Sequence, residues 1–347
     1  MRAWFWKPFV VVLVAWEPSG ILAAEDPQVK VSRLARELAE QQRRYGQIDR
    51  RVQEVRTELA DTYVEIGETG KACDLYKKIV EVYTRKPPAD YTTSLKASVQ
   101  LATLLGAMEQ RKKARGIYQS VVRELSRRLP ADDGYLLWVE HRLAMTMHEL
   151  EDFEHAYPLY KRVYEAYRRK HGERSLETLG VAANYGAAAI EIGKHEEGCA
   201  LLEKIVETLE KERPSERDLL DHTRHNLAVG YGRLCRHEKA VEIEEALLKA
   251  LLERPGSHEL ELAVRLNLSE SALMLGKLNK ARLHAEKVVE MASRDRKRYG
   301  GELAQARKLL AKIQSAGGKK KDRGRTADEK PAEKTAGLPL PSYRHPG

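Results

Sequence analysis

Two histidines three residues apart are the residues in this sequence whose spacing best suits chemistry. His222 and His225 lie in a stretch predicted to be helical, and their separation places both imidazoles on one side of a helix, as metal binding requires. The chain has no His-Glu-x-x-His motif and no cysteine pair that would complete a tetrahedral set. The preferred interpretation is therefore two surface histidines without a metal.

Other catalytic patterns are also absent from the sequence. No glycine-rich phosphate loop follows a predicted strand, and no strand-turn-helix segment carries a nucleophile. Three cysteines, Cys73, Cys199 and Cys235, are too few and too scattered for a disulfide framework, so we expect structural thiols. The sequence predicts a protein that is not an enzyme and has no cofactor, with an unrecognised hydrolase as the remaining enzymatic hypothesis.

A large residue followed by a small one recurs at a nearly constant interval. We call the small member of each pair the reference position. Successive reference positions are 42, 42, 42, 42 and 41 residues apart. The pairs are Leu59-Ala60, Leu101-Ala102, Leu143-Ala144, Tyr185-Gly186, Leu227-Ala228 and Leu268-Ser269. A second small residue follows twelve positions later, at Ala72, Ala114, Ala156, Gly198, Ala240 and Ala281. Two such columns indicate six structural repeats.

Each repeat is predicted to be two helices joined by a tight turn. Apolar residues recur at helical spacing on both sides of the turn. Gly67, Gly193 and Gly276 lie seven residues after the reference position, where a helix end favours a left-handed residue, and Glu109, Glu151 and Cys235 occupy the other three turns. Between repeats lie the breakers Pro87-Pro88, Pro130, Gly172, Pro214, Pro255-Gly256 and Gly300.

The repeat resembles a known family. The pattern Leu-Ala-x-x-Tyr-x-x-x-Gly-x-x-x-x-Ala-x-x-x-Tyr, as in residues 59–76, resembles the tetratricopeptide repeat (TPR), and the period is similar to that of kinesin light chains. The resemblance implies an all-α fold: an α-solenoid, or right-handed superhelix, whose first helices line a concave groove that binds protein partners. Glu244 and Ala285 depart from the aromatic residue that Tyr76, Tyr118 and Tyr160 supply, so looser packing is expected in the last two repeats.

The repeats occupy residues 47–298, and the segments on either side have their own patterns. Residues 28–46 have three-and-four spacing and are predicted to form an N-terminal capping helix, with a short coiled coil as the alternative. Residues 301–315 are predicted to form a lone helix that covers the last apolar face.

Residues 1–24 combine a positive start, an apolar run and a small-residue end, which predicts a cleaved signal peptide. Glu17 and Pro18 make a retained membrane anchor the less favoured alternative. The chain is therefore expected to be exported, into a periplasm or beyond.

Residues 316–347 lack periodicity and are predicted to be a disordered basic tail. The formal net charge of the chain is +9, and the tail carries a cluster of cations at Lys319, Lys320, Lys321, Arg323 and Arg325. Such a cluster can contact a polyanion, although a solvated tail without a dedicated partner is the preferred interpretation.

Helical geometry selects the residues that would face the groove. They lie six and two residues before the reference position, and one and five after it. In the first repeat all four are acidic: Glu54, Glu58, Asp61 and Glu65. They would either receive a Lys- or Arg-rich segment or form a solvated face near the end of the array. From the other repeats, the candidates for partner binding are Gln100, Trp138, Arg142, Asn184, Asn226, Arg233 and Asn267.

Two features of this set stand out. Asn184, Asn226 and Asn267 hold the same position in successive repeats, where an amide can bond to the backbone of an extended peptide. The alternative is that they bridge neighbouring helices. Trp138 and Arg142 belong to the residue types favoured as binding anchors, although Trp138 packed against the preceding repeat is an equal alternative. We predict a non-catalytic scaffold or adaptor that binds a partner in the groove; the alternative is a cell-envelope accessory protein that binds a polyanion through its tail.

Overall fold

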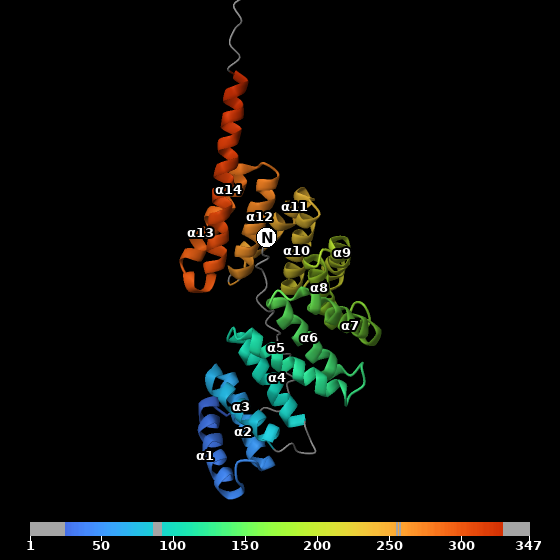
Figure 1. Cartoon of the computed structure of the whole chain (residues 1–347), viewed down its shortest axis with the longest axis vertical. Coiled ribbons are helices and arrows are strands. Elements are labelled where there is room, and N and C mark those ends of the chain that lie inside the picture. Colours follow the sequence, from blue (N-terminus) through green and yellow to red (C-terminus); the bar gives the residue numbers. More distant parts are fainter. Residues whose placement is uncertain (1–24, 86–91, 255, 257, 329–347) are drawn as a thin grey trace, which may run out of the picture. The chain divides into compact units, whose positions relative to one another are not determined.

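The protein is helical throughout the part of the chain that the structure describes. The computed structural model describes residues 25–85, 92–254, 256 and 258–328 (Figure 1). The expected signal peptide and the last part of the expected tail, 329–347, lie outside these residues, as do the breakers Pro87, Pro88 and Pro255. None of the described helices is both long and apolar enough to cross a bilayer.

Two compact units divide the chain at residue 236, and each is described by itself. The first unit contains ten helices: α1 (Pro27–Tyr45), α2 (Arg50–Glu65), α3 (Thr69–Arg85), α4 (Thr92–Ala107), α5 (Arg111–Ser126), α6 (Gly134–Glu149), α7 (Phe153–His171), α8 (Leu176–Glu191), α9 (His195–Glu212) and α10 (Arg217–Arg233). The second contains α11 (His237–Leu252), α12 (His258–Met274), α13 (Leu278–Ser293) and α14 (Arg296–Asp328). Within each unit, every helix packs against its neighbours in sequence, as in an α-solenoid.

The hairpins are built on the two columns of small residues. Ala60 and Ala72 are completely buried, and so are their counterparts Ala144 and Ala156 in the third repeat. A small residue at each of these positions lets the first and second helix of a hairpin approach closely. The prediction of sequential helix hairpins is therefore confirmed.

All six turns within repeats share one helix-ending geometry. The residue seven after the reference position has a positive φ in every case, including three residues that are not glycine: Glu109 at 60°, Glu151 at 59° and Cys235 at 57°. The next backbone N–H donates to the carbonyl five residues earlier, as Gln110 does to Leu105 at 2.8 Å. This bond satisfies a carbonyl that the end of the helix would otherwise leave without a partner.

The ends of the helical array have amphipathic helices. Leu34 and Leu38 of α1 are buried in one apolar cluster with Val52 and Leu59 of α2, as expected of a capping helix. In the second unit, α14 packs against α12 and α13 through an apolar side that includes Leu303. The helix extends to Asp328, past the expected end of the cap at residue 315 and into the segment that composition predicts to be disordered. The Lys, Arg and Ala residues of this stretch favour helix, whereas Gly317, Gly318 and Gly324 oppose it.

The non-glycine turns allow a test of backbone strain. We expect Glu109→Gly to raise the free energy of unfolding by about 1 kcal/mol, because glycine adopts a positive φ without the steric cost of a Cβ. Gly193→Ala should lower it by a similar amount, since an added Cβ there would touch nothing within 4 Å and only the backbone conformation is penalised. Urea unfolding followed by circular dichroism measures both. Equal midpoints for the two variants would contradict the strain argument.

A second test concerns the close approach of α8 and α9. An added Cβ on Gly198 of α9 would lie 2.6 Å from the Gly186 carbonyl oxygen and 2.6 Å from Ile190 Cγ1, both on α8. We expect Gly198→Ala to lower the unfolding free energy by about 2 kcal/mol, because the helices must move apart. Gly180→Ala is the control: it lies on α8 with nothing within 4 Å and should stabilise the protein slightly through its higher helix propensity. A Gly198→Ala midpoint at or above that of the parent would overturn this account of the packing.

Candidate partner-binding face

The acidic residues of the first repeat lie together on α2 and are exposed. Glu54, Glu58, Asp61 and Glu65 occupy one side of this helix. Arg50 pairs with Glu54 at 2.8 Å, and Lys30 of α1 lies 3.8 Å from Glu58. Tyr76 of α3 donates its hydroxyl hydrogen to Asp61. Desolvation raises the pKa of Asp61, while the bond from Tyr76 opposes that shift. Asp61 therefore joins the two helices of its hairpin.

Tyrosines of the second helices reach the same position in the next repeats. In the second repeat, the Tyr118 and Thr103 hydroxyls are 2.7 Å apart. The equivalent of Asp61 and Thr103 in the third repeat is Met145, which offers no oxygen acceptor. The completely buried Tyr160 hydroxyl consequently has no hydrogen-bond partner among the described residues.

Trp138 and Arg142 lie one turn apart on α6, and both are half-buried. The Trp138 ring stacks on Tyr135 of the same helix, with centroids 6.0 Å apart and planes inclined by 15°. Arg142 has no ion pair with any described residue. A guanidinium one helical turn from an indole, with no close ion pair to hold it, can bind a partner. Gln100, the candidate from α4, is exposed.

The three asparagines occupy equivalent positions with different surroundings. Asn184 of α8 is 6% exposed, and its amide nitrogen donates to Nε2 of His141 on α6 at 3.0 Å. Desolvation lowers the pKa of His141 to about 4, with Arg142 contributing, so the imidazole is neutral at pH 7 and can accept. Asn184 is therefore engaged in bridging two neighbouring first helices.

The other two asparagines differ from Asn184. In the second unit, the Asn267 amide of α12 donates to the buried Glu244 of α11 at 3.3 Å, so it also bridges helices. Asn226 of α10 is 5% exposed, and its amide nitrogen has no partner among the described residues. The partner of Asn184, His141, lies 43 residues before it. The residue 43 positions before Asn226 is Ala183, whose side chain cannot accept a hydrogen bond.

Two ion pairs connect successive repeats on this face. Arg111 of α5 donates to Glu149 of α6 at 3.0 Å, and Arg233 of α10 lies 3.9 Å from Glu191 of α8. Desolvation raises the pKa of both carboxyls, and the arginines oppose the shift. Arg233, a candidate for partner binding, thus lies within ion-pair distance of a carboxylate, whereas Arg142 acts on the Glu149 carboxylate only from a longer range. Sequence reasoning overlooked Arg111 and His141 because neither occupies one of the four selected positions.

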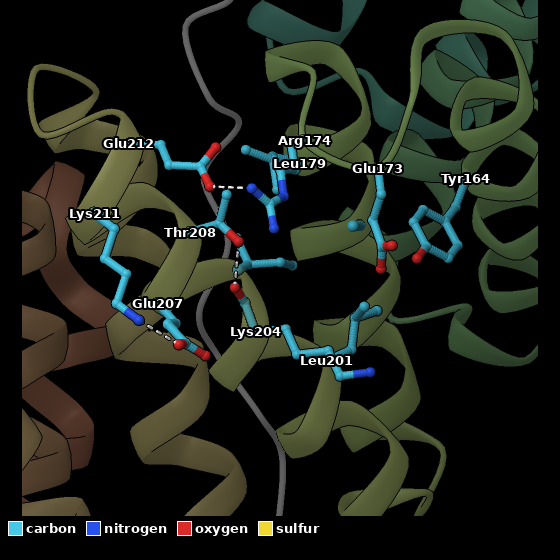
Figure 2. A pocket seen from close by; sticks show the side chains of 12 residues that line it. Tyr164, Glu173, Arg174, Leu179, Leu201, Lys204, Glu207, Thr208, Lys211 and Glu212 are labelled. Carbon is cyan, nitrogen blue, oxygen red and sulfur yellow. Dashed lines mark hydrogen bonds and ion pairs between the residues drawn. The ribbon is translucent and has the colours of Figure 1, made fainter.

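Two hollows of the first unit lie beside the second helices, and none of the candidate partner-binding residues lines them. One, of about 360 Å³, is bounded by α7, α8 and α9 (Figure 2). Arg174 pairs with Glu212 and Lys211 with Glu207 at its rim, above a floor that includes Ile205. The other, of about 640 Å³, is bounded by α3, α4 and α5. Both lie at the same repeat position, since Val80 and Tyr164 each follow their reference residue by twenty.

Within the described ranges, no three or more His, Cys, Asp or Glu side chains are grouped as metal ligands. Desolvation lowers the pKa of His222 to about 4, with the neighbouring His225 contributing. All three cysteines are free; Cys73 and Cys199 are buried, and Cys235 is exposed in its turn.

Known proteins were compared with the chain in three ways. No family model matches it, and neither does any curated protein sequence. Among solved structures, the apo form of RapI has a TM-score of 0.55 at 13% identity, covering 87% of this chain and 88% of its own. BtubC (BKLC) from P. vanneervenii has a TM-score of 0.52 at 20% identity, covering 66% and 94%. A tetratricopeptide repeat protein from Parabacteroides merdae has a TM-score of 0.51 at 12% identity, covering 82% and 99%. These similarities show that the fold is that of tetratricopeptide-type repeat arrays.

The buried histidine makes stability depend on pH. A histidine whose folded pKa is about 4 stays neutral, while in the unfolded chain it gains a proton below about pH 6.5, so stability falls as the pH drops from 6.5 towards 4. The expected loss from His141 is on the order of 3 kcal/mol at the acidic end. We expect His141→Gln to unfold with a shallower pH dependence, because glutamine has no charge to gain. The exposed His171→Gln is the control and should retain the parent's dependence. Identical pH profiles for all three proteins would refute the assignment.

Proposed function

We propose that the protein is a non-catalytic scaffold that binds a protein partner on the face formed by its first helices. The fold supports this proposal, because tetratricopeptide-type arrays are interaction scaffolds. The observation that carries it is the pair Trp138 and Arg142 on α6, half-buried and without an intramolecular ion pair. Most other candidate side chains on this face are bonded to neighbouring helices.

The chemistry of this pair indicates what a partner would supply. An indole and a guanidinium together bury apolar area while holding a carboxylate or a backbone carbonyl. Asn184 beside them is committed to His141, so it shapes the surface and leaves the polar contact to Arg142. The acidic side of α2 would add contacts to a Lys- or Arg-rich part of the same partner.

Export is the second part of the proposal, and it rests on the sequence of residues 1–24. A positive start, an apolar run and a small-residue end are the features that secretion machinery recognises. The partner would then be another exported or envelope protein. The N-terminal sequence of the protein recovered from the exported fraction tests this: a start near residue 25 is expected, and recovery of uncleaved chain from the cytoplasm would contradict it.

The partner face is tested by comparing captured proteins. We expect Arg142→Glu, and separately Trp138→Ala, to lose a specific set of partners at least tenfold, because each removes an anchor worth about 2 kcal/mol or more and about 1.4 kcal/mol corresponds to tenfold. Arg169→Glu, an exposed charge change on α7, is the matched control and should keep the set. Quantitative mass spectrometry of affinity-purified complexes measures the loss. A set that survives both anchor changes and disappears when residues 316–347 are deleted would favour binding of a polyanion-associated partner through the tail instead.

A further inference from the structure

The second helices of the first unit change the sign of their charge along the array. α5 has five Lys and Arg and one Glu, whereas α9 has six Glu and two Lys. Equivalent repeat positions carry opposite charges: Lys112 corresponds to Glu196, and Arg123 to Glu207, each pair being 84 residues apart. All four side chains are exposed. The outer sides of α5 and α9 are therefore complementary surfaces on one chain.

The hollow between α3 and α5 lies on the basic side. Its floor is apolar, with Leu95, Ile117 and Val121 among the lining residues, and no acidic side chain lines it. Lys77 and Lys113 stand at its edges. Lys77 pairs only with the exposed Asp74 at 3.2 Å, and such a pair contributes little and exchanges readily. An acidic helix laid along this hollow would meet apolar surface below and cations on both sides.

Small residues leave room for a helix in this hollow. Gly116 of α5 lines it, and a Cβ added there would touch nothing within 4 Å. Ser94, Ser98 and Ser120 are the other small lining residues. The second hollow, at α9, differs because its rim charges already pair with each other, Arg174 with Glu212 and Lys211 with Glu207. The hollow between α3 and α5 is lined by cations and by no acidic side chain, whereas charges of both signs line the hollow at α9.

We propose that α9 of one copy of this chain docks into the hollow between α3 and α5 of another copy. α9 has 18 residues and is therefore about 27 Å long, enough to cover the 16-residue α5. Its exposed Glu196 and Glu207 lie three turns apart. The exposed pair of Glu207 with Lys211, like that of Lys77 with Asp74, contributes little and exchanges readily, so both carboxylates can meet the cations at the two sides of the hollow. Because different surfaces of the two copies meet, the contact is heterologous and produces a ring or an open chain of subunits.

Sedimentation velocity of the purified full chain tests this contact. We expect concentration-dependent association between about 1 and 100 µM, with a dissociation constant at least tenfold weaker in about 500 mM salt than in about 50 mM, because exposed charges are screened. Lys77→Glu with Lys113→Glu should give monomers, and so should Glu196→Lys with Glu207→Lys. A parent chain that stays monomeric throughout would overturn the proposal, including the case in which the hollow binds an unrelated acidic partner.

An equimolar mixture provides the sharpest control. Each charge-reversed variant places like charges opposite each other at the contact, whereas the acidic hollow of one variant faces the lysines introduced at positions 196 and 207 of the other, so mixing should restore association. Failure to associate on mixing, with both variants folded by circular dichroism, would overturn the pairing. Gly116→Leu should block association by filling the hollow, while Gly116→Ala should weaken it less than threefold; equal effects of the two would also overturn it. These results are independent of partner capture by Arg142 and Trp138.

Discussion

The close approach of the two helices in the hairpins within each unit is the constraint on which the rest of this structure depends. Where Ala60 faces Ala72, or Gly186 approaches Gly198, neither helix has a side chain that could hold the pair apart. This contact fixes the rotation of both helices about their axes. Once the rotation is fixed, the remaining side chains are divided between the face of the first helices and the outer side of the second helices. Both candidate surfaces follow from that division.

The same constraint explains why polar residues recur inside the array. Helices held this closely bury some polar positions, and a buried polar group is costly unless it finds a partner. Tyr76 meets Asp61 and Asn184 meets His141 for this reason. The Asn226 amide and the Tyr160 hydroxyl have no partner among the described residues. In other repeats the equivalent group meets an acceptor, but here that acceptor is replaced by Ala183 for Asn226 and by Met145 for Tyr160. A recurring residue type in a repeat protein is therefore not in itself a mark of ligand binding.

The sequence was sufficient for the fold and insufficient for the site. The recurrence of small residues and of positive-φ turns is local information, so the helix hairpins and even the strained Glu109 and Cys235 could be placed beforehand. The partner of a polar side chain lies about 43 residues away, as His141 does from Asn184, and depends on the pitch between repeats. The position of Asn184 in the helical period predicts that its side chain points away from the hairpin core. The same period does not predict whether the side chain meets solvent or a histidine of another repeat. The extension of α14 to Asp328 was missed for a different reason, because composition describes an average and helix propensity acts residue by residue.

The hollows beside the second helices could not be predicted from the sequence either. They add a second candidate surface for binding to the face of the first helices. Repeat arrays are usually considered from the side of their first helices, where most polar groups here are already bonded to one another. On the outer side, the space between successive second helices varies with the bulk at a few positions. Gly116 and Ser120 leave it open beside α5, whereas the equivalent Ala200 and Lys204 of α9 fill more of it. None of the candidate residues on the first-helix face lines the hollow between α3 and α5, so each surface can be changed without altering the side chains of the other.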